Sequence, residues 1–240
     1  MVYRLQVSGM ITDMNKNVIY QKKTEFGLLQ VADLEDRRLL LCSHHIESAV
    51  YTVPGRENEL VFPYMQSFSY AFAARPAIKK TLLIGGGAFS YPRYYLTEYP
   101  DCTIDVIEIS PDVLAADEQY FGLDQVKNDR MRIIMEDGFS YLQRTEETYD
   151  LIINDAFTGG KHEGRDEESC RLIQLHLNSH GIYMVNSASA VKGPYSAEYR
   201  HFSNVMKKVF QHTAFLQCEE DRSLFEKQNL LLIGSEDSLL

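Results

Sequence analysis

The sequence predicts an α/β protein in which a doubly wound, mainly parallel sheet follows a small antiparallel β-domain. From residue 79 onward, apolar segments of strand length alternate with helical patterns, as they do in parallel sheets with crossover helices. The first of these segments runs directly into three glycines, which is typical of a strand that ends beside a ligand. Before residue 75, short strand-like segments recur at intervals of about ten residues, as in small antiparallel sheets. We therefore expect two domains, residues 1–75 and residues 76–240.

The composition is that of an ordinary globular protein. The 240 residues are 45% hydrophobic and 24% charged, and the formal net charge of −10 argues against a nucleic-acid partner. Four scattered cysteines form no Cys-x-x-Cys pair, and His44-His45 has no third ligand at useful spacing, so reduced thiols and no metal site are expected. No segment approaches membrane-spanning length. We therefore expect no membrane partner and a cytoplasmic location.

Residues from Val2 to about Tyr51 are expected to form strands and turns, and the first domain is expected to contain four strands and a connecting helix. The strand-like segments are rich in β-favouring residues and are separated by turns such as Pro54-Gly55. They cover residues 18–20, 26–31, 38–42 and 48–53. A helix is predicted from about Leu60 to Ala74, because residues such as Tyr64 and Phe68 share one apolar face, and Arg75-Pro76 ends it.

The second domain is expected to contain the strands of a mainly parallel sheet with helices on both faces. Such strands appear as continuous apolar runs. They cover residues 81–84, 103–109, 131–135, 149–155, 182–186, 213–217 and 230–233. Ser110 and Ser196 each mark the start of a helix, because serine is a preferred capping residue. A further helix is predicted from about Glu167 to Asn178, with Gly181 closing it.

Gly85, Gly86 and Gly87 follow the first strand of this domain. Glycine lets the backbone turn sharply and approach a ligand, and the next helix then directs its free N–H groups toward that ligand. Nucleotide-like cofactors are bound in this way at the carboxyl ends of parallel strands. The dinucleotide fingerprint requires a third glycine where Ser90 stands, so a nicotinamide oxidoreductase is the weaker alternative.

Carboxylates occur at the ends of the next three strands. Glu108 lies about twenty residues past the glycines, where an acidic side chain accepts hydrogen bonds from ribose hydroxyls, although it is also compatible with a solvated strand end. Asp137-Gly138 suits an exocyclic amine and a flat base, but Asp-Gly is equally a common turn pair. Asp155 is placed to hold or deprotonate an amine, or to cap a helix. Together they indicate a ligand site at one edge of the sheet.

This combination resembles S-adenosylmethionine-dependent transferases, and in particular the spermidine synthase (aminopropyltransferase) family. The similar segments extend over nearly the whole chain and include a helix that carries Tyr64. They are residues 62–66, 83–87, 107–111, 136–138 and 149–155. The resemblance implies a seven-stranded Rossmann-like sheet behind an N-terminal β-domain.

The resemblance also implies a ligand and a set of roles. The donor would be S-adenosylmethionine or its decarboxylated form, with no metal, and the acceptor would be a small amine. Asp155 and Tyr64 would be the catalytic residues and would lie near the acceptor amine. The donor-binding residues would be Gly85, Gly86, Gly87, Glu108, Ile109, Asp137 and Gly138, with Glu108 on the ribose and Asp137 near the adenine. Members of the family are often dimers or tetramers, so a homodimer or homotetramer is expected.

Two positions depart from the family pattern. The family places an aspartate after the glycines, where it pairs with the amine of the aminopropyl tail, and this chain has Ala88. A second family aspartate, which binds the polyamine, is replaced by Thr158. A buried ammonium without a partner costs on the order of several kcal/mol, so these changes weaken the case for a decarboxylated donor. Methyl transfer and aminopropyl transfer therefore both stay open.

A different class of function is a non-catalytic homologue that binds the nucleoside or acts as an assembly module. The two missing aspartates motivate this alternative. A pocket without activity need not keep all of its ligand-binding residues. This alternative is therefore disfavoured by the retention of Gly85, Gly87, Glu108, Asp137 and Asp155. A transferase is therefore the preferred interpretation.

Overall fold

A computed structural model of the chain describes residues 17–43, 45–156, 164–219 and 221–239. Two compact units can be distinguished. The first comprises the described part of Met1–Phe62 with Gly86–Pro100 and Ser110–Met131, and the second comprises Pro63–Gly85, Asp101–Ile109 and the described part of Arg132–Leu240. The division predicted at residue 75 stays a prediction.

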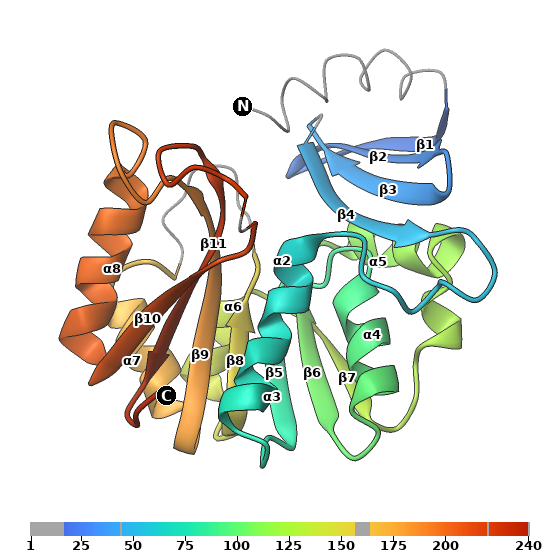
Figure 1. Ribbon diagram of the computed structural model, residues 1–240. Coiled ribbons are helices and arrows are strands. Elements are labelled where there is room, and N and C mark those ends of the chain that lie inside the picture. The colour runs from blue at the N-terminus through green and yellow to red at the C-terminus, as the bar shows by residue number, and fades with distance from the viewer. Residues whose placement is uncertain (1–16, 44, 157–163, 220, 240) are drawn as a thin grey trace. The chain divides into compact units, whose positions relative to one another are not determined.

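The first unit contains a four-stranded antiparallel sheet whose strands follow one another in sequence order, shown in blue in Figure 1. Its strands are β1 (Val18–Thr24), β2 (Gly27–Leu34), β3 (Arg37–Cys42) and β4 (His45–Tyr51). The sequence predicted four strands in these places. Residues 1–16, where the prediction also placed strands and turns, lie outside the described residues.

Two helices and a short 3₁₀ turn belong to the same unit. They are α4 (Ser90–Glu98), α5 (Pro111–Tyr120) and η2 (Leu123–Gln125). Ser110 caps α5 as predicted, because its hydroxyl accepts a hydrogen bond from the Val113 N–H at 3.3 Å. An apolar cluster joins β2, β3 and β4 to the glycine loop and α5. Its buried members are Leu29, Val31, Leu40, Val50, Ala88, Ala116 and Phe121.

The second unit contains a seven-stranded sheet with the order β10-β11-β9-β8-β5-β6-β7. The strands are β5 (Lys80–Ile84), β6 (Thr103–Glu108), β7 (Met131–Met135), β8 (Tyr149–Asn154), β9 (Leu177–Ser189), β10 (His212–Gln217) and β11 (Gln228–Ser235). β5 pairs in parallel with β6 and β8, and β8 pairs in parallel with β9. β11 runs antiparallel to both of its neighbours. The predicted doubly wound, mainly parallel sheet of seven strands is confirmed.

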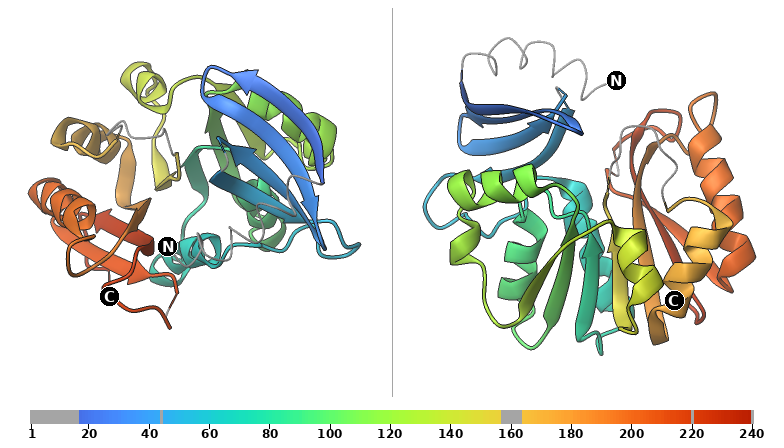
Figure 2. Two further views of the ribbon diagram at one scale, coloured as in Figure 1. Left: turned by 90° about the horizontal axis from the view of Figure 1, so that it is seen from above. Right: turned by 180° about the vertical axis from the view of Figure 1, so that it is seen from behind.

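Helices cover both faces of this sheet. α6 (Gly138–Arg144), α7 (Glu167–Leu175) and α8 (Ala197–Val209) lie on one face, as Figures 1 and 2 show. The opposite face carries α2 (Pro63–Gln66), the 3₁₀ turn η1 (Ser67–Ser69) and α3 (Tyr70–Ala74). The core between the sheet and the first group of helices consists mainly of buried hydrophobic side chains. It includes Leu82, Ile152, Cys170, Ile173, Tyr183, Phe202, Met206 and Leu232.

The end of α7 was predicted wrongly. The helix stops at Leu175, and β9 begins at Leu177, which pairs with Tyr149 of β8. Gly181 therefore lies inside a strand and does not close a helix. Backbone pairing with β8 outweighs the helical pattern of this segment, and a register shift between Tyr149 and Leu151 accommodates it.

Two further local predictions differ in detail. The helix predicted from Leu60 begins at Pro63, where proline fits the first helical position, and a 3₁₀ turn interrupts it. Ser196 precedes α8 as predicted, but its hydroxyl donates to the Gly193 carbonyl at 2.7 Å and makes no capping bond to the helix.

A buried polar cluster ties β6 to β7 and β8. The Asp105 carboxylate accepts hydrogen bonds from Nε of Arg132 at 3.0 Å and from the Tyr149 hydroxyl at 2.8 Å. Tyr141 on α6 contacts the Tyr149 hydroxyl at 3.0 Å. Because a buried carboxylate is tolerated only with such partners, this cluster fixes the position of β6, the strand that ends in Glu108.

Candidate active site

Asp155 lies directly after β8 and is held by side chains from two other elements. One carboxylate oxygen, Oδ2, accepts a hydrogen bond from the Tyr64 hydroxyl of α2 at 3.0 Å. The other, Oδ1, accepts from the Asn186 amide of β9 at 2.9 Å. All three residues belong to the second unit. The structure thus brings together the two residues for which the sequence suggested catalytic roles, Asp155 and Tyr64.

The electrostatics of Asp155 suit proton transfer. Burial raises the pKa of its carboxyl group from 3.8 to about 6, although the hydrogen bonds from Asn186 and Tyr64 act in the opposite direction. Both donors are neutral, and no cationic side chain of the described residues forms an ion pair with this carboxylate. A carboxylate with this pKa is ionised near neutral pH and is still able to take a proton.

Asn186 is a site residue that sequence reasoning missed. It lies near the carboxyl end of β9, and its side chain is 4% exposed. Its Nδ2 donates to Asp155, but its Oδ1 has no hydrogen-bond partner among the described residues. The available signal was its place at the end of the apolar run 182–185, on the strand next to β8. An unused buried acceptor beside a carboxylate suits a ligand N–H or ammonium group.

The ends of β5, β6 and β8 meet around Gly85. Its N–H donates to the Ile107 carbonyl of β6, and the Asp155 N–H donates to the Ile84 carbonyl, both at 2.9 Å. Its φ is +99°, and an added Cβ would lie 3.0 Å from the Asp155 carbonyl oxygen and from the Ala156 nitrogen. Glycine is therefore required here by backbone conformation and by the close approach of the segment that carries Asp155.

The predicted adenosine-binding residues lie at the ends of β6 and β7. Glu108 is the last residue of β6 and is buried, and Ile109 beside it is 41% exposed. Asp137 caps α6, because its Oδ1 accepts a hydrogen bond from the Ser140 N–H at 2.8 Å, a role that was not considered for it beside the ligand role and the plain turn. A Cβ on Gly138 would lie 2.5 Å from Cγ2 of Ile84, so packing against β5 requires this glycine.

Gly86 and Gly87 belong to the first unit. Gly87 has a φ of +52°, and an added Cβ would lie 3.2 Å from Cβ of Ser48 on β4. The Ser48 hydroxyl in turn contacts the Ser90 hydroxyl at 3.2 Å. Ala88 is fully buried in the apolar cluster of this unit. The other departure from the family pattern, Thr158, lies outside the described residues.

In the described part of the chain, no group of three histidine, cysteine, aspartate or glutamate side chains is placed to hold a metal ion. None of the helices that the structure describes is both long and apolar enough to cross a membrane.

Comparison with curated proteins supports the resemblance. A polyamine aminopropyltransferase of Vibrio vulnificus is 27% identical over 203 residues, which cover 80% of this chain and 65% of that protein. A probable polyamine aminopropyl transferase of Bifidobacterium longum is 25% identical over 218 residues, which cover 88% of this chain and 47% of that protein. The chain thus spans about half to two thirds of the length of these relatives.

Solved structures share the fold. A probable spermidine synthase from Corynebacterium glutamicum superimposes with a TM-score of 0.75 at 20% identity, covering 91% of this chain and 80% of that chain. Spermidine synthase from Thermotoga maritima gives a TM-score of 0.71 at 18% identity, covering 92% of this chain and 73% of that chain. Human methyltransferase-like protein 13, in complex with SAH, gives a TM-score of 0.60 at 18% identity, covering 72% of this chain and 82% of that chain.

A family model gives stronger evidence of family membership than these pairwise similarities do. The model describes a spermine/spermidine synthase domain, and it matches residues 68–219, which is more than half of the chain. The chain therefore belongs to the spermine/spermidine synthase family.

Proposed function

We propose that the chain is an aminopropyltransferase that moves an aminopropyl group from decarboxylated S-adenosylmethionine to a small amine. Family membership supports this reaction class. The observation that carries the proposal is the Asp155 carboxylate, which neutral donors on Tyr64 and Asn186 hold and no described cation neutralises. Such a carboxylate is free to pair with an ammonium ion supplied by the acceptor.

Asp155 has two tasks in the proposed reaction. It holds the acceptor ammonium and takes one proton from it, so that the nitrogen lone pair becomes available. The nitrogen then attacks the carbon next to the sulfonium of the donor. The new C–N bond forms while the C–S bond breaks, and the electron pair of the broken bond stays on sulfur, which leaves as the neutral thioether of methylthioadenosine.

Tyr64 and Asn186 orient this carboxylate. Their two hydrogen bonds fix both carboxylate oxygens, so that proton transfer needs no rearrangement of Asp155. The unused Oδ1 of Asn186 is available to accept a hydrogen bond from a second N–H of the acceptor ammonium. The same arrangement suits any small primary amine, because an ammonium ion carries several donors.

Methyl transfer from S-adenosylmethionine is the second candidate, and a specific observation favours it. Ala88 takes the place of the family aspartate, and its side chain is fully buried among apolar neighbours in its own unit. Position 88 therefore supplies no carboxylate to attract the amine of a decarboxylated donor or to repel the carboxylate of S-adenosylmethionine.

The products distinguish the two reactions. The protein is incubated with each donor and a panel of diamines and monoamines, and methylthioadenosine and S-adenosylhomocysteine are measured by mass spectrometry. We expect methylthioadenosine from the decarboxylated donor, with the rate reduced on the order of 10² to 10⁴-fold in Asp155→Asn. Asp101→Asn is the matched control, because the Asp101 side chain is 84% exposed. S-adenosylhomocysteine from the other donor would favour the methyltransferase, and absence of both products would favour the non-catalytic alternative.

A further inference from the structure

Given the aminopropyl transfer proposed above, on which this role rests, we propose that Arg165 is a positioning residue that holds Asn186 and, through it, the Asp155 carboxylate. The Arg165 guanidinium forms an ion pair with Glu198 through Nη1, and its Nη2 donates to the Asn186 carbonyl at 3.2 Å. The Asn186 side chain in turn donates to Oδ1 of Asp155 at 2.9 Å. All four residues belong to the second unit. Arg165 therefore acts on Asp155 through one intermediate residue.

Asn186 lies where β9 extends beyond its parallel neighbour. β8 ends at Asn154, which pairs with Val185, so Asn186 is the first residue of β9 past that ladder. A backbone carbonyl at this point takes its donor from outside the two strands, and the Arg165 guanidinium supplies one. The direction of the Asn186 side chain toward Asp155 thus depends on a side-chain contact as well as on strand pairing.

The backbone that carries Arg165 is closely packed. The preceding residue, Gly164, has a φ of +80°, and an added Cβ would lie 2.5 Å from Cζ of Phe139 and 2.7 Å from Nδ2 of Asn154. The Arg165 side chain is 16% exposed, and burial lowers the pKa of its guanidinium. Because desolvation offsets the attraction in a buried ion pair, such a pair adds little net stability. We attribute its presence here to the geometry that it fixes.

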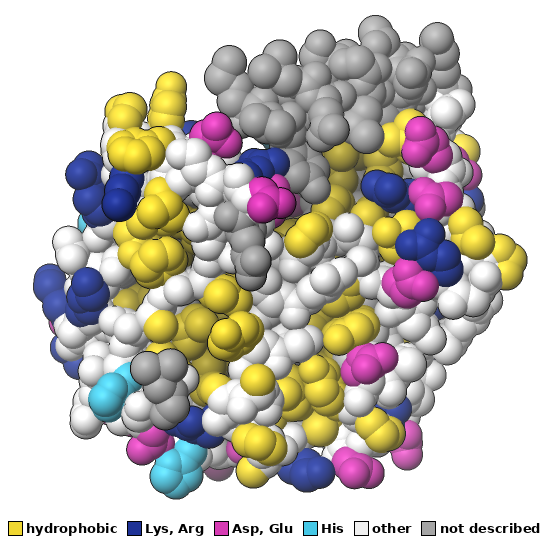
Figure 3. All heavy atoms as spheres, viewed as in Figure 1, with side chains coloured by type: hydrophobic (Ala, Val, Ile, Leu, Met, Phe, Trp, Pro, Cys, Tyr) yellow, Lys and Arg dark blue, Asp and Glu magenta, His cyan; other side chains and the backbone are white. Residues whose placement is uncertain are grey.

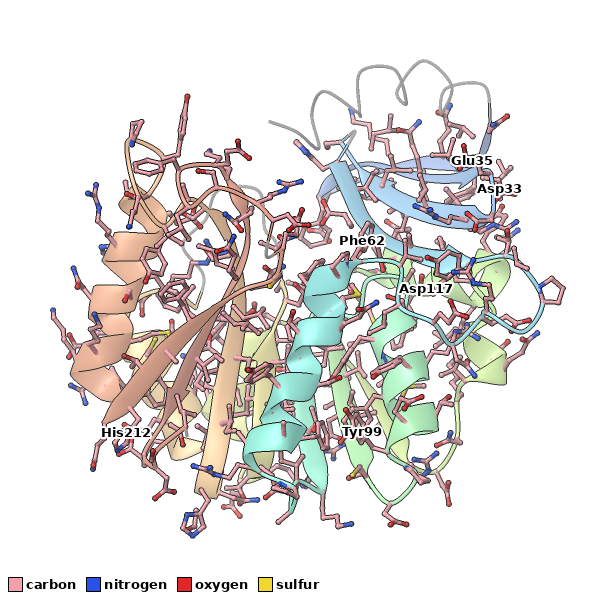
Figure 4. All side chains as sticks on the ribbon, in the orientation of Figure 1. Asp33, Glu35, Phe62, Tyr99, Asp117 and His212 are labelled. Atoms are coloured by element: carbon pink, nitrogen blue, oxygen red, sulfur yellow. The ribbon has the colours of Figure 1, made fainter. Side chains whose placement is uncertain are left out.

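Glu198 holds the other side of the guanidinium. It is the one acidic residue in the sequence of α8, and it lies in the first turn, where the helix dipole favours a carboxylate. Its Oε1 also accepts a hydrogen bond from the Ser187 hydroxyl at 3.4 Å, so this carboxylate ties α8 to the end of β9. Figure 4 labels His212, which begins β10 beyond the last turn of α8, so Glu198 lies at the opposite end of that helix.

The rest of α8 has the opposite charge. Lysine and arginine side chains gather on the surface over this helix in Figure 3. The exposed basic residues of α8 are Arg200, Lys207 and Lys208. Glu198 is thus an isolated carboxylate on a basic helix, and it is directed to Arg165 at the edge of the sheet where β9 ends.

Positioning and simple charge predict different results. Burial raises the pKa of Asp155, and the hydrogen bond from Asn186 lowers it. If Arg165 and Glu198 position Asn186, then Arg165→Gln and Glu198→Gln both loosen this bond, and both raise the pKa of Asp155 further. If they act only through their charges, loss of the cation raises this pKa and loss of the anion lowers it. The Cys218 thiol is also within electrostatic range of Asp155, but burial raises its pKa to about 11, so it stays neutral.

The test is a pH titration of Arg165→Gln and of Glu198→Gln. Urea unfolding is measured from about pH 4 to about pH 8, with and without Asp155→Asn in each background, and it reports the proton on Asp155 whether or not the chain transfers an aminopropyl group. The pH-dependent loss of stability should extend to higher pH in both variants than in the parent, by about half a pH unit or more. The acid limb of kcat/KM with decarboxylated S-adenosylmethionine should move in the same direction.

Two further variants control the comparison. Arg171→Gln removes an arginine that is 55% exposed and pairs with Glu167 on α7, and it should leave the titration of Asp155 as in the parent. Arg165→Lys keeps the charge but lacks the planar fork that reaches two acceptors, so it should shift the titration as Arg165→Gln does. Circular dichroism of each variant shows that the fold is kept.

The signs of the shifts decide the outcome. Shifts of opposite direction in Arg165→Gln and Glu198→Gln would overturn the proposal, because charge alone then explains them. Titrations that stay unmoved in both variants would overturn it as well. Shifts to higher pH in both variants of a chain that forms no methylthioadenosine would count against aminopropyl transfer and would still support the positioning of Asp155 by Arg165.

Discussion

Asp155→Asn should stabilise the protein at alkaline pH while it removes activity. Asp155 has its pKa raised from 3.8 to about 6 by burial, so the folded state binds this proton more tightly than the unfolded state does. The native protein therefore becomes less stable as the pH rises from about 4 to about 6. Above that range the full loss of unfolding free energy persists. Raising this pKa from 3.8 to about 6 corresponds to about 3 kcal/mol of unfolding free energy. Asparagine carries no charge and avoids this cost.

Urea unfolding of the parent and of Asp155→Asn at several pH values measures this effect. The variant should exceed the parent by about 2–3 kcal/mol in unfolding free energy at pH 8 and by little at pH 4, since both then have a neutral side chain. Tyr64 can still donate to the asparagine carbonyl, and Asn186 can turn its unused Oδ1 toward the new amide. A stability difference that does not change between pH 4 and pH 8 would refute the raised pKa.

Three other substitutions test neighbouring parts of the structure. Tyr64→Phe removes a hydrogen bond that favours the ionised carboxylate, so the pKa of Asp155 should rise and the acid limb of the kcat/KM profile should move to higher pH; an unmoved limb would contradict this role. Gly85→Ala should destabilise the fold by about 1–3 kcal/mol in thermal or urea unfolding, because φ is +99° and the Asp155 carbonyl is close. Ala88→Asp should lower the melting temperature by several degrees, because the new carboxylate would be buried in an apolar cluster; an unchanged melting temperature would argue against that burial.

Several strands of the second unit were predictable because a short, mainly apolar run between turn residues is a plain sequence pattern. The buried β5 and the half-exposed β7 are both such runs, and the structure places both within one residue of the predicted bounds. The start of α5 was equally clear from its capping serine and following proline. The end of α7 was not predictable from the sequence. Residues 177–180 join β9 through pairing with β8, and the local sequence contains no signal for that distant contact.

The candidate site was predictable only in part, because its residues meet through the order of the strands. Strand ends and the family resemblance pointed to Asp155 and Tyr64, whose catalytic roles stay a prediction, and the structure adds the 3.0 Å bond between them. Asn186 was missed, because its contact with Asp155 depends on β9 lying beside β8. The glycines show a further limit. Gly138 stands where a ligand role was predicted, yet close contact with Ile84 by itself requires a glycine there.

Calorimetric titration with three ligands tests the central claim most directly. The protein is titrated side by side with decarboxylated S-adenosylmethionine, with S-adenosylmethionine, and with methylthioadenosine, which contains the adenosine thioether common to both donors. The proposed aminopropyltransferase predicts that the decarboxylated donor binds at least about tenfold more tightly than S-adenosylmethionine, a difference of about 1.4 kcal/mol. Tighter binding of S-adenosylmethionine would contradict it and indicate a methyltransferase, and absence of binding by all three ligands would remove the donor site altogether.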